Sequence, residues 1–597
     1  MKSLRWNLDA LYPGFESQEF KDDFERFEKE LVEFQAWTQE NFKTTDQASE
    51  TLQEYLRREI EHRKLIQRLS AYCHLTLSVD SKDEAAKRAQ NGLRNHLGDM
   101  TQLEVRFIQF IKQLENLEDL IRSSEFLLEH EFYLLEKKQE ADHLLSVEEE
   151  VVIANMQNTG SMAFGTLQGD LTANLMIEVD LPEGRQQLPL AAVRNLAYST
   201  DAAVRKSGYD SEQMAYGRIE ESSAAALNAI KGEVITVAKL RGWSDPMAQT
   251  LVDSRMTSAT LDTLILTIEE YLPYFRQYLK RKAELLGYTD GLPFYELFAP
   301  IGEVDRTFTY ESAIDYIVTS FKPFSQKLAD YVQGAYDKEW LDVEPRAGKR
   351  GGAFCSNLPT IGESRIMSNF NGSFSNMTTL AHELGHGYHG HQLKSQSIIN
   401  TGYPMPIAET ASIFNETIVT NAALSEAAGA EKIAILESNI SDANQVITDI
   451  YSRFLFESEL FERRKTSTLS VNELKEIMTD AQKKAYGNGL DHNILHPYMW
   501  MNKPHYYRAE LSFYNFPYAF GLLFAKGLYA RYLTMGDDFL PLYDQLLAAT
   551  GKQTIKDLTA SVGIDIESPD FFRSSLDLIK GDIMAFLELT DKGVNQQ

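Results

Sequence analysis

The sequence predicts a mainly α protein of two or more lobes with a small β element. Helical spacing of apolar side chains dominates the chain and is interrupted at two stretches, residues 165–190 and 343–372. The apolar share of 43% and the aromatic share of 11% are typical of a globular protein. Because 597 residues exceed what one hydrophobic core normally organises, at least two lobes are expected.

The N-terminal third is predicted to be a helical layer. Steps of four and three residues, which place side chains on one helix face, separate Phe20, Phe24, Phe27, Leu31 and Phe34. The same spacing separates Leu103, Phe107, Phe110, Leu114 and Leu117. Each set forms one apolar stripe, so each helix is expected to pack against a neighbour through that stripe.

The helical period first breaks at residues 165–190, where glycine and proline appear. A short strand pair or an extended loop is expected there. We therefore place a boundary near residues 150–200 and divide the chain into an N-terminal helical region, 1–200, and a C-terminal region, 201–597. No repeat, low-complexity tract or long linker separates two independent domains.

The second break, residues 343–372, contains "RIMSNF", which is predicted to be a short strand. Gly351 and Gly352 precede it and would let another backbone approach closely. A bound peptide could add itself as a strand to an exposed edge here. An ordinary turn before a buried strand is the alternative.

Charge and composition exclude several classes of partner. With 87 acidic and 59 basic side chains, the net charge of −28 repels nucleic acid and anionic lipid. We expect neither a signal peptide nor a membrane span, because no apolar stretch approaches the ~20 residues that a spanning helix needs. Only Cys73 and Cys355 are present, which fits a reducing compartment, so the cytoplasm is expected.

The segment "TTLAHELGHGYHG", residues 378–390, predicts a metal site. His382 and His386 are four residues apart, so on a helix both imidazoles lie on one face and can reach one ion. Glu383 points about a quarter-turn away, where it would not bind the ion but could take a proton from the attacking water. This arrangement is typical of catalytic Zn²⁺, one ion per chain. A surface helix with incidental histidines is the alternative.

The third ligand is predicted to be Glu409. His389 lies seven residues after His382, about two turns or ~10 Å along a straight helix, and therefore cannot join the site. No acidic residue occurs between 387 and 408, and Glu409 is the first to follow. Pro404 and Pro406 suit the entry to a new helix, with Glu409 in its first turn.

Glu416 is predicted to hold a metal-bound histidine in position. It lies seven residues after Glu409 on the same helix face. A histidine ligand usually gives its other N–H to a carboxylate or a carbonyl, and Glu416 could accept it. A solvated helix charge is the alternative for this residue.

The chain resembles the M3 metallopeptidases, and more closely the oligoendopeptidase F branch. The resemblance rests on "HELGH" followed by "IAETASIFNE" in a long acidic helical protein. It extends to "RWNLDALYPG", "LPLAAVRNLAYSTDAAVRKSGYDS", "GKRGGAF" and "KPHYYRAELSFYNFPYAFG". It implies two helical lobes around a deep substrate channel with zinc on its floor. Residues 1–200 would then form a channel wall, and residues 201–597 the metallopeptidase region with short oligopeptides as substrates.

The resemblance also implies which residues bind the substrate carbonyl. Residues 498–518 are rich in hydrogen-bond donors, namely Tyr498, His505, Tyr506, Tyr507, Tyr514 and Tyr518. By resemblance, His505, Tyr514 and Tyr518 lie where the family keeps its carbonyl donors, which act on the oxygen that becomes negative during attack. Pro517 departs from the family pattern, so the choice between Tyr514 and Tyr518 stays open. An aromatic core strip is the alternative.

The function expected from these observations is a zinc-dependent endopeptidase that cleaves short unstructured oligopeptides, with Glu383 as the general base. A peptidyl-dipeptidase of similar helical fold is one alternative. It would need a cationic clamp for the substrate C-terminus, and basic residues such as Arg350 or Lys503 cannot be assigned that role from the sequence. A non-catalytic peptide-binding protein is another, which the presence of Glu383 disfavours. The oligomeric state stays open.

Overall fold

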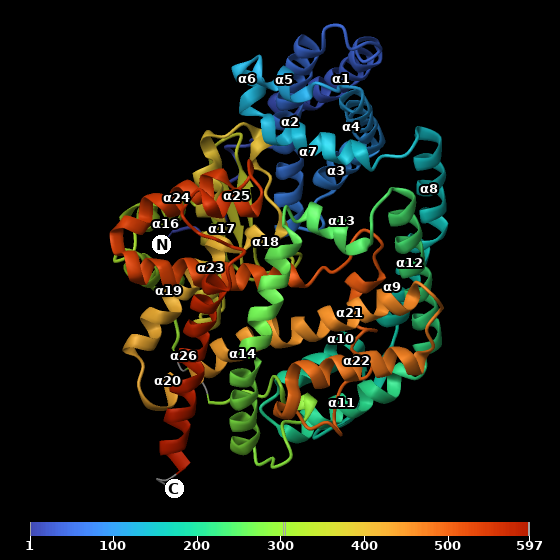
Figure 1. Ribbon diagram of the computed structural model, residues 1–597. Helices are drawn as coiled ribbons and strands as arrows, with labels where there is room; N and C mark the ends of the chain where they lie inside the picture. The colour runs from blue at the N-terminus through green and yellow to red at the C-terminus, as the bar shows by residue number, and fades with distance from the viewer. Residues whose placement is uncertain (1, 303, 305, 595–597) are drawn as a thin grey trace. The chain divides into compact units, whose positions relative to one another are not determined.

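The computed structural model describes residues 2–302, 304 and 306–594, and the mainly α class that the sequence predicts is confirmed (Figure 1). The chain divides into two compact units. The first comprises residues 1–144, 306–422 and 531–564, and the second comprises residues 145–305, 423–530 and 565–597. Within the described residues, no helix is both long enough and apolar enough to cross a membrane.

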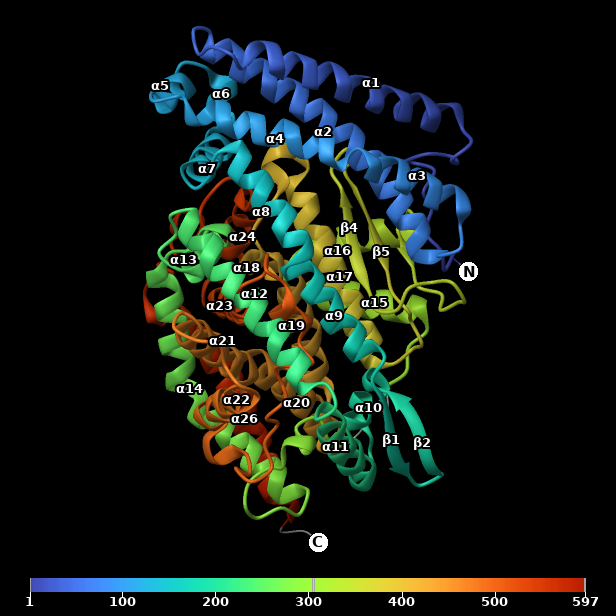
Figure 2. The same ribbon diagram turned by 90° about the vertical axis from the view of Figure 1, so that its right-hand side faces the viewer.

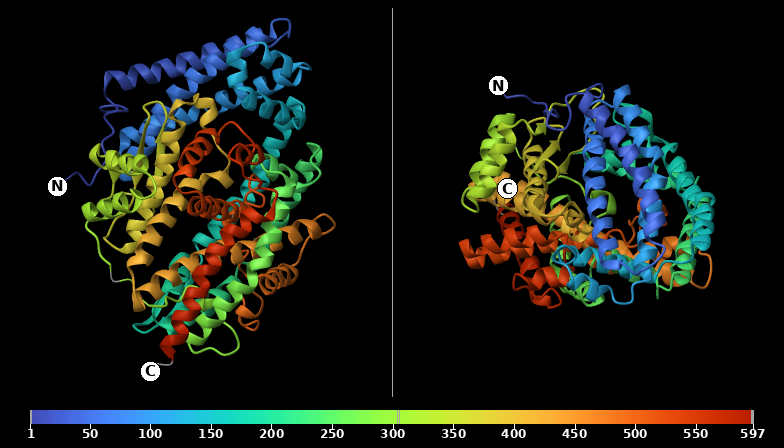
Figure 3. Two further views of the ribbon diagram at one scale, coloured as in Figure 1. Left: turned by 60° about the vertical axis from the view of Figure 1, so that its left-hand side comes forward. Right: turned by 90° about the horizontal axis from the view of Figure 1, so that it is seen from above.

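The N-terminal layer of the first unit consists of helices, as predicted. They are α1 (Gln18–Asn41), α2 (Ala48–Val79), α3 (Glu84–Asn95), α4 (Leu97–Lys112), α5 (Leu117–Arg122), α6 (Glu125–Glu129) and α7 (Glu131–Asp142). Helices α1 and α2 run side by side (Figure 3). The apolar stripe of α1 is buried except for Phe24, which is partly buried. In the same core the Tyr55 and Phe107 rings stack with centroids 3.7 Å apart.

The second predicted stripe does not lie on one helix. Helix α4 ends at Lys112, so Leu114 falls in a turn and Leu117 opens α5, although both side chains are buried. The apolar spacing therefore continues across a break in the helix. It predicts that these side chains are buried but not that the helix is continuous.

The rest of the first unit contains a three-stranded sheet with strand order β3-β5-β4. Strand β3 (Leu341–Asp342) pairs in parallel with β5 (Glu363–Met367), and β4 (Phe354–Leu358) pairs antiparallel to β5. The strand expected in "RIMSNF" is thus confirmed as β5. Figure 2 shows β4 and β5 beside helix α17 (Phe374–Gln392).

The remaining helices of this unit come before the sheet or after α17 in the sequence. They are α15 (Tyr310–Phe321), α16 (Gln326–Asp337), α18 (Met405–Ala408), α19 (Thr410–Glu426, in this unit as far as Ala422), α24 (Phe539–Ala549) and α25 (Ile555–Ala560).

The second unit consists of helices and one hairpin. Its helices are α8 (Val147–Thr159), α9 (Ser161–Ala173), α10 (Leu190–Asn195), α11 (Ala202–Tyr216), α12 (Glu220–Leu240), α13 (Pro246–Asp253), α14 (Ser258–Leu285), α20 (Gly429–Asn444), α21 (Ile450–Arg464), α22 (Val471–Tyr486), α23 (Phe516–Met535, here as far as Ala530) and α26 (Pro569–Val594). Strands β1 (Met176–Leu181) and β2 (Gly184–Pro189) pair antiparallel.

The first of the compact units changes to the second after Leu144. One expectation about the region near residue 165 needs correction. The strand pair predicted within residues 165–190 is present, but residues 165–173 belong to helix α9. The physical reason is that α9 packs on α12, where the amide of Ser161 donates to Glu233 Oε2 at 2.9 Å. Residues 145–200 are therefore part of the second unit's core.

Candidate metal centre

Helix α17 carries the histidine motif, and two of its glycines allow close packing. A Cβ at Gly385 would lie 2.5 Å from the carbonyl oxygen of Ala411, at the start of α19. A Cβ at Gly387 would lie 2.2 Å from the hydroxyl of Tyr331 in α16. Real Cβ atoms essentially never approach heavy atoms below 3.0 Å. The spacing of glycines in "HELGHGYHG" thus lets α16 and α19 lie directly against the motif.

Glu409 lies at a break between two helices. The sequence predicts one helix starting near Pro404 with Glu409 in its first turn, but α18 ends at Ala408 and α19 begins at Thr410. Glu409 has φ −89° and ψ 6° between them, so its carboxylate is placed by the junction. Glu416 lies further along α19, and Gly385 is where that helix crosses α17.

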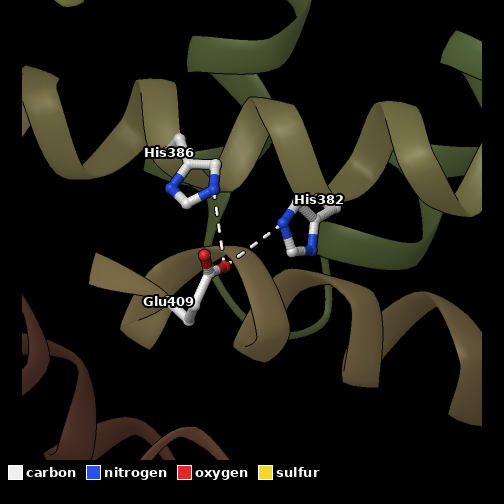
Figure 4. A group of neighbouring side chains, drawn as sticks. All are labelled: His382, His386 and Glu409. Carbon is white, nitrogen blue, oxygen red and sulfur yellow. Dashed lines mark ion pairs between the residues drawn. The ribbon is translucent and has the colours of Figure 1, made fainter. Parts of the chain in front are cut away.

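The side chains of His382, His386 and Glu409 converge on one point, within the first unit (Figure 4). The Nε2 atoms of His382 and His386 lie 3.3 and 3.5 Å from the same oxygen, Oε2 of Glu409. One donor atom from each residue lies within 4.8 Å of the other two. Ligands about 2.05 Å from Zn²⁺ at tetrahedral angles lie about 3.3 Å apart. The two histidines and the glutamate therefore fit Zn²⁺ both in chemistry and in spacing.

Two further side chains orient these donors. Nδ1 of His382 lies 3.2 Å from Glu416 Oε2, so the carboxylate would accept the Nδ1 proton when Nε2 binds a metal ion on the side that faces Glu409. The hydroxyl of Ser412 donates to Glu409 Oε2 at 2.7 Å. Glu416 was expected from the sequence to meet a histidine, and it lies against His382.

The close approach of these groups shifts their pKa values. Burial alone would lower the pKa of His382, but its hydrogen bonds to Glu409 and Glu416 raise it to about 10. Burial alone would raise the pKa of Glu409, but the hydrogen bond from His382 and the charge of His386 lower it to about 2. Burial lowers the pKa of His386 to about 4. Glu409 is therefore an anion near neutral pH, which suits a ligand for a cation.

Glu383 is buried beside this group and does not belong to it. Burial raises its pKa to about 7, against the opposing charge of His382 and a hydrogen bond from the backbone N–H of Cys355. A carboxyl group with such a pKa exchanges a proton readily near neutral pH, as a general base must.

His389 lies outside the donor group, as the helical spacing predicts. Its side chain is fully buried, its Nε2 lies 2.9 Å from Thr550 Oγ1, and its ring stacks on Tyr403 with centroids 4.2 Å apart. Burial lowers its pKa to about 3. The third histidine of the motif is thus a packed, neutral side chain of the core.

The three C-terminal candidates form a cluster of their own within the second unit. The hydroxyl oxygens of Tyr514 and Tyr518 lie 2.7 Å apart, and the rings of His505 and Tyr514 lie 5.4 Å apart between centroids. Pro517 is in the first turn of α23, a position that proline favours, so it is compatible with the helix that carries Tyr518. Tyr514 precedes that helix.

A chain of hydrogen bonds determines which ring nitrogen of His505 carries the proton. Arg453 Nη1 donates to Asn515 Oδ1 at 3.2 Å, so the side-chain amide nitrogen of Asn515 is the atom that faces His505. That nitrogen donates to His505 Nε2 at 2.8 Å. Arg453 is itself paired with buried Asp449. Nε2 is therefore an acceptor, and the proton of neutral His505 is on Nδ1.

Burial, together with the charges of Arg453 and Lys503, lowers the pKa of His505 to about 3. The imidazole therefore stays neutral and offers one N–H donor. Within the described residues, Nδ1 makes no hydrogen bond, so this donor is available to a ligand.

Sequence reasoning missed Ser412, Asn515 and Arg453. Ser412 follows Glu409 by three residues at the start of α19, where a serine beside a carboxylate is a recognisable local signal. Asn515 stands in irregular backbone between the short helix at Pro504–Tyr507 and α23. Arg453 is far away in the sequence on α21, so neither of these two residues had a periodic signal.

Two family comparisons cover most of the chain. The sequence model of "Peptidase family M3" matches residues 195–578, and that of "Oligopeptidase F" matches residues 113–176. The first match alone spans more than half of the chain and includes the histidine motif, Glu409 and His505.

Relatives and solved structures agree with these matches. The chain is 23% identical to an oligoendopeptidase F homolog of Lactococcus lactis subsp. lactis, over 100% of this chain and 98% of the relative. A solved structure from Chlamydophila abortus has the same fold, with a TM-score of 0.85 at 20% identity over 98% of both chains. The structure of oligoendopeptidase-F from Enterococcus faecium gives a TM-score of 0.70 at 18% identity, over 96% of this chain and 99% of that one. The chain therefore belongs to peptidase family M3 and is a zinc-dependent metallo-endopeptidase that acts on oligopeptides.

Proposed function

We propose that this chain cleaves internal bonds of short unstructured oligopeptides, with one Zn²⁺ per chain held by His382, His386 and Glu409 and with Glu383 as the general base. The observation that carries the proposal is the spacing of the donors: both imidazole Nε2 atoms lie 3.3–3.5 Å from one carboxylate oxygen. When bound there, Zn²⁺ supplies Lewis acidity, which lowers the pKa of a water ligand and polarises a carbonyl.

The residues around the ion have separate roles in this proposal. Glu383 follows His382 on α17 and is buried beside the donors, so its carboxylate takes the proton of the attacking water and returns it to the leaving amine. Glu416 holds the Nδ1 proton of His382 and thereby keeps Nε2 as a ligand. Ser412 holds the oxygen of Glu409 that meets both histidines.

His505, Tyr514 and Tyr518 are proposed to bind the substrate carbonyl oxygen as it becomes negative. The Nδ1–H of neutral His505 is a donor without a protein acceptor among the described residues, which supports this role. The adjacent tyrosine hydroxyls supply further donors 2.7 Å from each other. A donor aimed at the developing oxyanion is typically worth ~3 kcal/mol in the transition state.

Strand β4 supports the proposal that substrate backbone is recognised by strand addition. It is the last strand in the order β3-β5-β4, so one of its edges has no partner strand among the described residues. It packs beside α17, and the backbone N–H of Cys355 in this strand reaches Glu383. A peptide paired along β4 would be held through its main chain, which tolerates many side chains.

We also propose that the enzyme is cytoplasmic, because both of its cysteines are free thiols, as is usual in a reducing compartment. We prefer an endopeptidase to a peptidyl-dipeptidase because a relative and a solved structure that match nearly the whole chain are oligoendopeptidases F. A purely peptide-binding protein would have no use for Glu383, since it is not a member of the donor group.

Glu383→Gln tests the central assignment. The amide keeps the shape of the side chain but cannot accept a proton, so turnover should fall by at least ~10²-fold while zinc stays stoichiometric. Zinc is measured by atomic spectroscopy and turnover with a quenched fluorogenic peptide. Glu118→Gln, on the surface of the same unit, is the matched control and should change neither quantity. Loss of zinc from Glu383→Gln would contradict the proposal.

A further inference from the structure

A cavity within the second unit holds a lysine without a counter-ion. The cavity has a volume of about 280 Å³ and is lined by Arg194, Arg205, Arg453 and Lys503, among others. Among the described residues, Glu212 is the one carboxylate that lines it. Such a concentration of cations is unusual in a chain with 28 more acidic than basic side chains, and it needs an explanation.

Three of these four cations have carboxylate partners. Arg205 pairs with Glu296 at 2.6 Å, and both side chains are buried. Arg194 lies 3.4 Å from Glu212, which also meets His496 at 3.5 Å.

Arg453 is paired with Asp449. The positive charge of the arginines that line the cavity is thus balanced by protein carboxylates.

Lys503 is the exception. In the part of the chain that the structure describes, no carboxylate pairs with its ammonium group and no hydrogen bond to it is present. The side chain is half-buried, and burial and then the charge of Arg453 lower its pKa to about 7, against the opposing charges of Asp449 and Glu212. The charged form has no direct partner and is costly in such a place, so an anion that joined it would stabilise that form.

The other walls of the cavity restrict the kind of anion. Val193, Phe298 and Met499 give it an apolar surface beside the cationic one. Its volume is near the lower end of ligand pockets, which span ~300–1,000 Å³, so it suits one bulky amino-acid residue. A second cavity of about 590 Å³ shares Ala191 and Arg194 with it and offers room for a connected chain.

We propose that this cavity binds the C-terminal residue of an oligopeptide, with the terminal carboxylate on Lys503 and an apolar side chain against Val193, Phe298 and Met499. This inference rests on the proposed peptidase function for the source of the ligand, but the site itself does not depend on catalysis. Such a site would make a free C-terminus part of what the enzyme recognises. Lys503 lies two residues before His505 in the sequence.

A binding measurement tests the site without turnover. N-acetyl-phenylalanine and its amide are titrated into the zinc-loaded protein by calorimetry. The acid should bind at least ~10-fold more tightly than the amide, as a hydrogen bond to a charged group predicts. Lys503→Met should abolish this preference, whereas Lys503→Arg, which keeps the charge, should retain most of it. Lys483→Met, an exposed lysine of the same unit, is the control and should behave as the parent protein.

A preference for the acid that survives Lys503→Met would overturn the proposal, because the carboxylate would then bind elsewhere, for example at zinc. Lack of any preference in the parent protein would overturn it as well. Thermal melting of each variant checks that the second unit is folded, and Lys503→Arg provides a reading even where Lys503→Met is unstable.

A kinetic measurement identifies the source of the carboxylate. One cleavable peptide ending in phenylalanine is compared with its C-terminal amide, and with a version in which an internal glutamine is replaced by glutamate. The free acid should be favoured ~10-fold in kcat/KM over the amide, and Lys503→Met should reduce that ratio to about one. If the internal glutamate, and not the free C-terminus, determines which peptide is preferred in kcat/KM, the assignment to the C-terminus is overturned. If no peptide is cleaved at all, the peptidase proposal fails while the calorimetric result still decides the site.

Discussion

At the scale of the residue, the candidate centre combines two kinds of carboxylate. Glu409 meets both imidazoles through one oxygen, whereas Glu416 meets the opposite nitrogen of His382 only. Removal of the first would delete one of three ligands, and removal of the second would delete only the group that orients a ligand. The two glutamates therefore differ in what they contribute to metal affinity.

We expect Glu409→Ala to lose zinc on dialysis, because two imidazoles alone hold the ion weakly. Glu416→Ala should bind zinc ~10–100-fold more weakly than the parent chain, as changes outside the ligand set do. Competition with a chromophoric chelator measures both affinities. Equal zinc affinities for the two variants would refute the division of roles.

The link between Asn515 and His505 gives a second residue-scale prediction. In Asn515→Asp the carboxylate would accept a proton from Nε2, so Nδ1 would lose its hydrogen and could no longer donate. kcat should then fall by on the order of 10²-fold, as for loss of one oxyanion donor, with zinc content unchanged. Steady-state kinetics with one peptide measures kcat and KM separately.

His505→Ala provides the comparison for this prediction and should lower kcat to a similar extent. Asn515→Leu, which removes the donor without forcing the opposite tautomer, should have a smaller effect than Asn515→Asp. An effect confined to KM in all three variants would argue for ground-state binding and against a role in the transition state.

The sequence predicted the local part of the site and not its connections. His382, Glu383 and His386 follow from the helical period alone, and Glu409 follows from the absence of earlier acidic residues. The bond from Arg453 to Asn515 joins residues 62 positions apart in the sequence, and no period connects them. The break between α18 and α19 at Glu409 could not be predicted from the sequence either, because the prolines before it are compatible with one helix as well as with two.

At the scale of the element, helix α17 is fixed by what lies against its glycines. The contact between Gly385 and the first residues of α19 determines how far the histidine helix is from Glu409, which immediately precedes α19. A larger residue at position 385 would have to displace backbone and not a flexible side chain. The distance between α17 and α19, and with it the spacing of the metal donors, therefore depends on the absence of a Cβ at position 385.

Gly385→Ala should destabilise the protein by ~1–3 kcal/mol, as overpacking does, and should weaken zinc binding at the same time. Melting temperature and zinc affinity measure the two effects. The matched control is Gly334→Ala, inside α16 of the same unit, where a Cβ would meet no heavy atom within 4 Å. That change should be neutral or should stabilise by up to ~1 kcal/mol. Normal zinc affinity in Gly385→Ala would show that the helices can separate without moving Glu409.

The periodicity of apolar residues predicted most helices but not which helices pack against each other. The stripe from Phe20 to Phe34 predicted α1, and the glycine- and proline-rich stretch predicted the hairpin of β1 and β2. Two glycines interrupt the apolar spacing of residues 165–173 and predict a break there, yet these residues are helical because α9 packs on α12. Tertiary contacts of this kind override local propensity.

At the scale of the whole molecule, the length of the chain bears on substrate choice. About 340 residues precede the sheet beside α17, and none of the proposed catalytic or metal-binding residues lies among them. The proposed use of so much additional structure is to wall the site, which keeps folded proteins out and water ordered.

Unstructured peptides of about five to twenty residues should therefore be cut internally, and long chains should be cut poorly. The measurement is kcat/KM for a length series that shares one cleavable sequence, extended at either end with flexible residues, at fixed salt. A steep fall beyond a threshold length is expected. Casein, a large unfolded protein, is the control substrate, and its efficient hydrolysis per site would contradict the expectation.

The division of the chain into interleaved segments also governs how the protein is made. Residues 1–144 belong to the same compact unit as residues 531–564, so the first unit cannot be complete until nearly the whole chain has left the ribosome. Many proteins fold one domain at a time from the N-terminus as they are synthesised, and neither unit here offers such a contiguous piece. The core of the early helices, which includes the stripe of α1, also contains Leu358, Met367 and Ile399, so it is not complete until those residues have been made. We therefore expect a nascent chain of this protein to expose apolar surface until at least residue 399 has been made, and a chain truncated before residue 531 to contain neither unit whole.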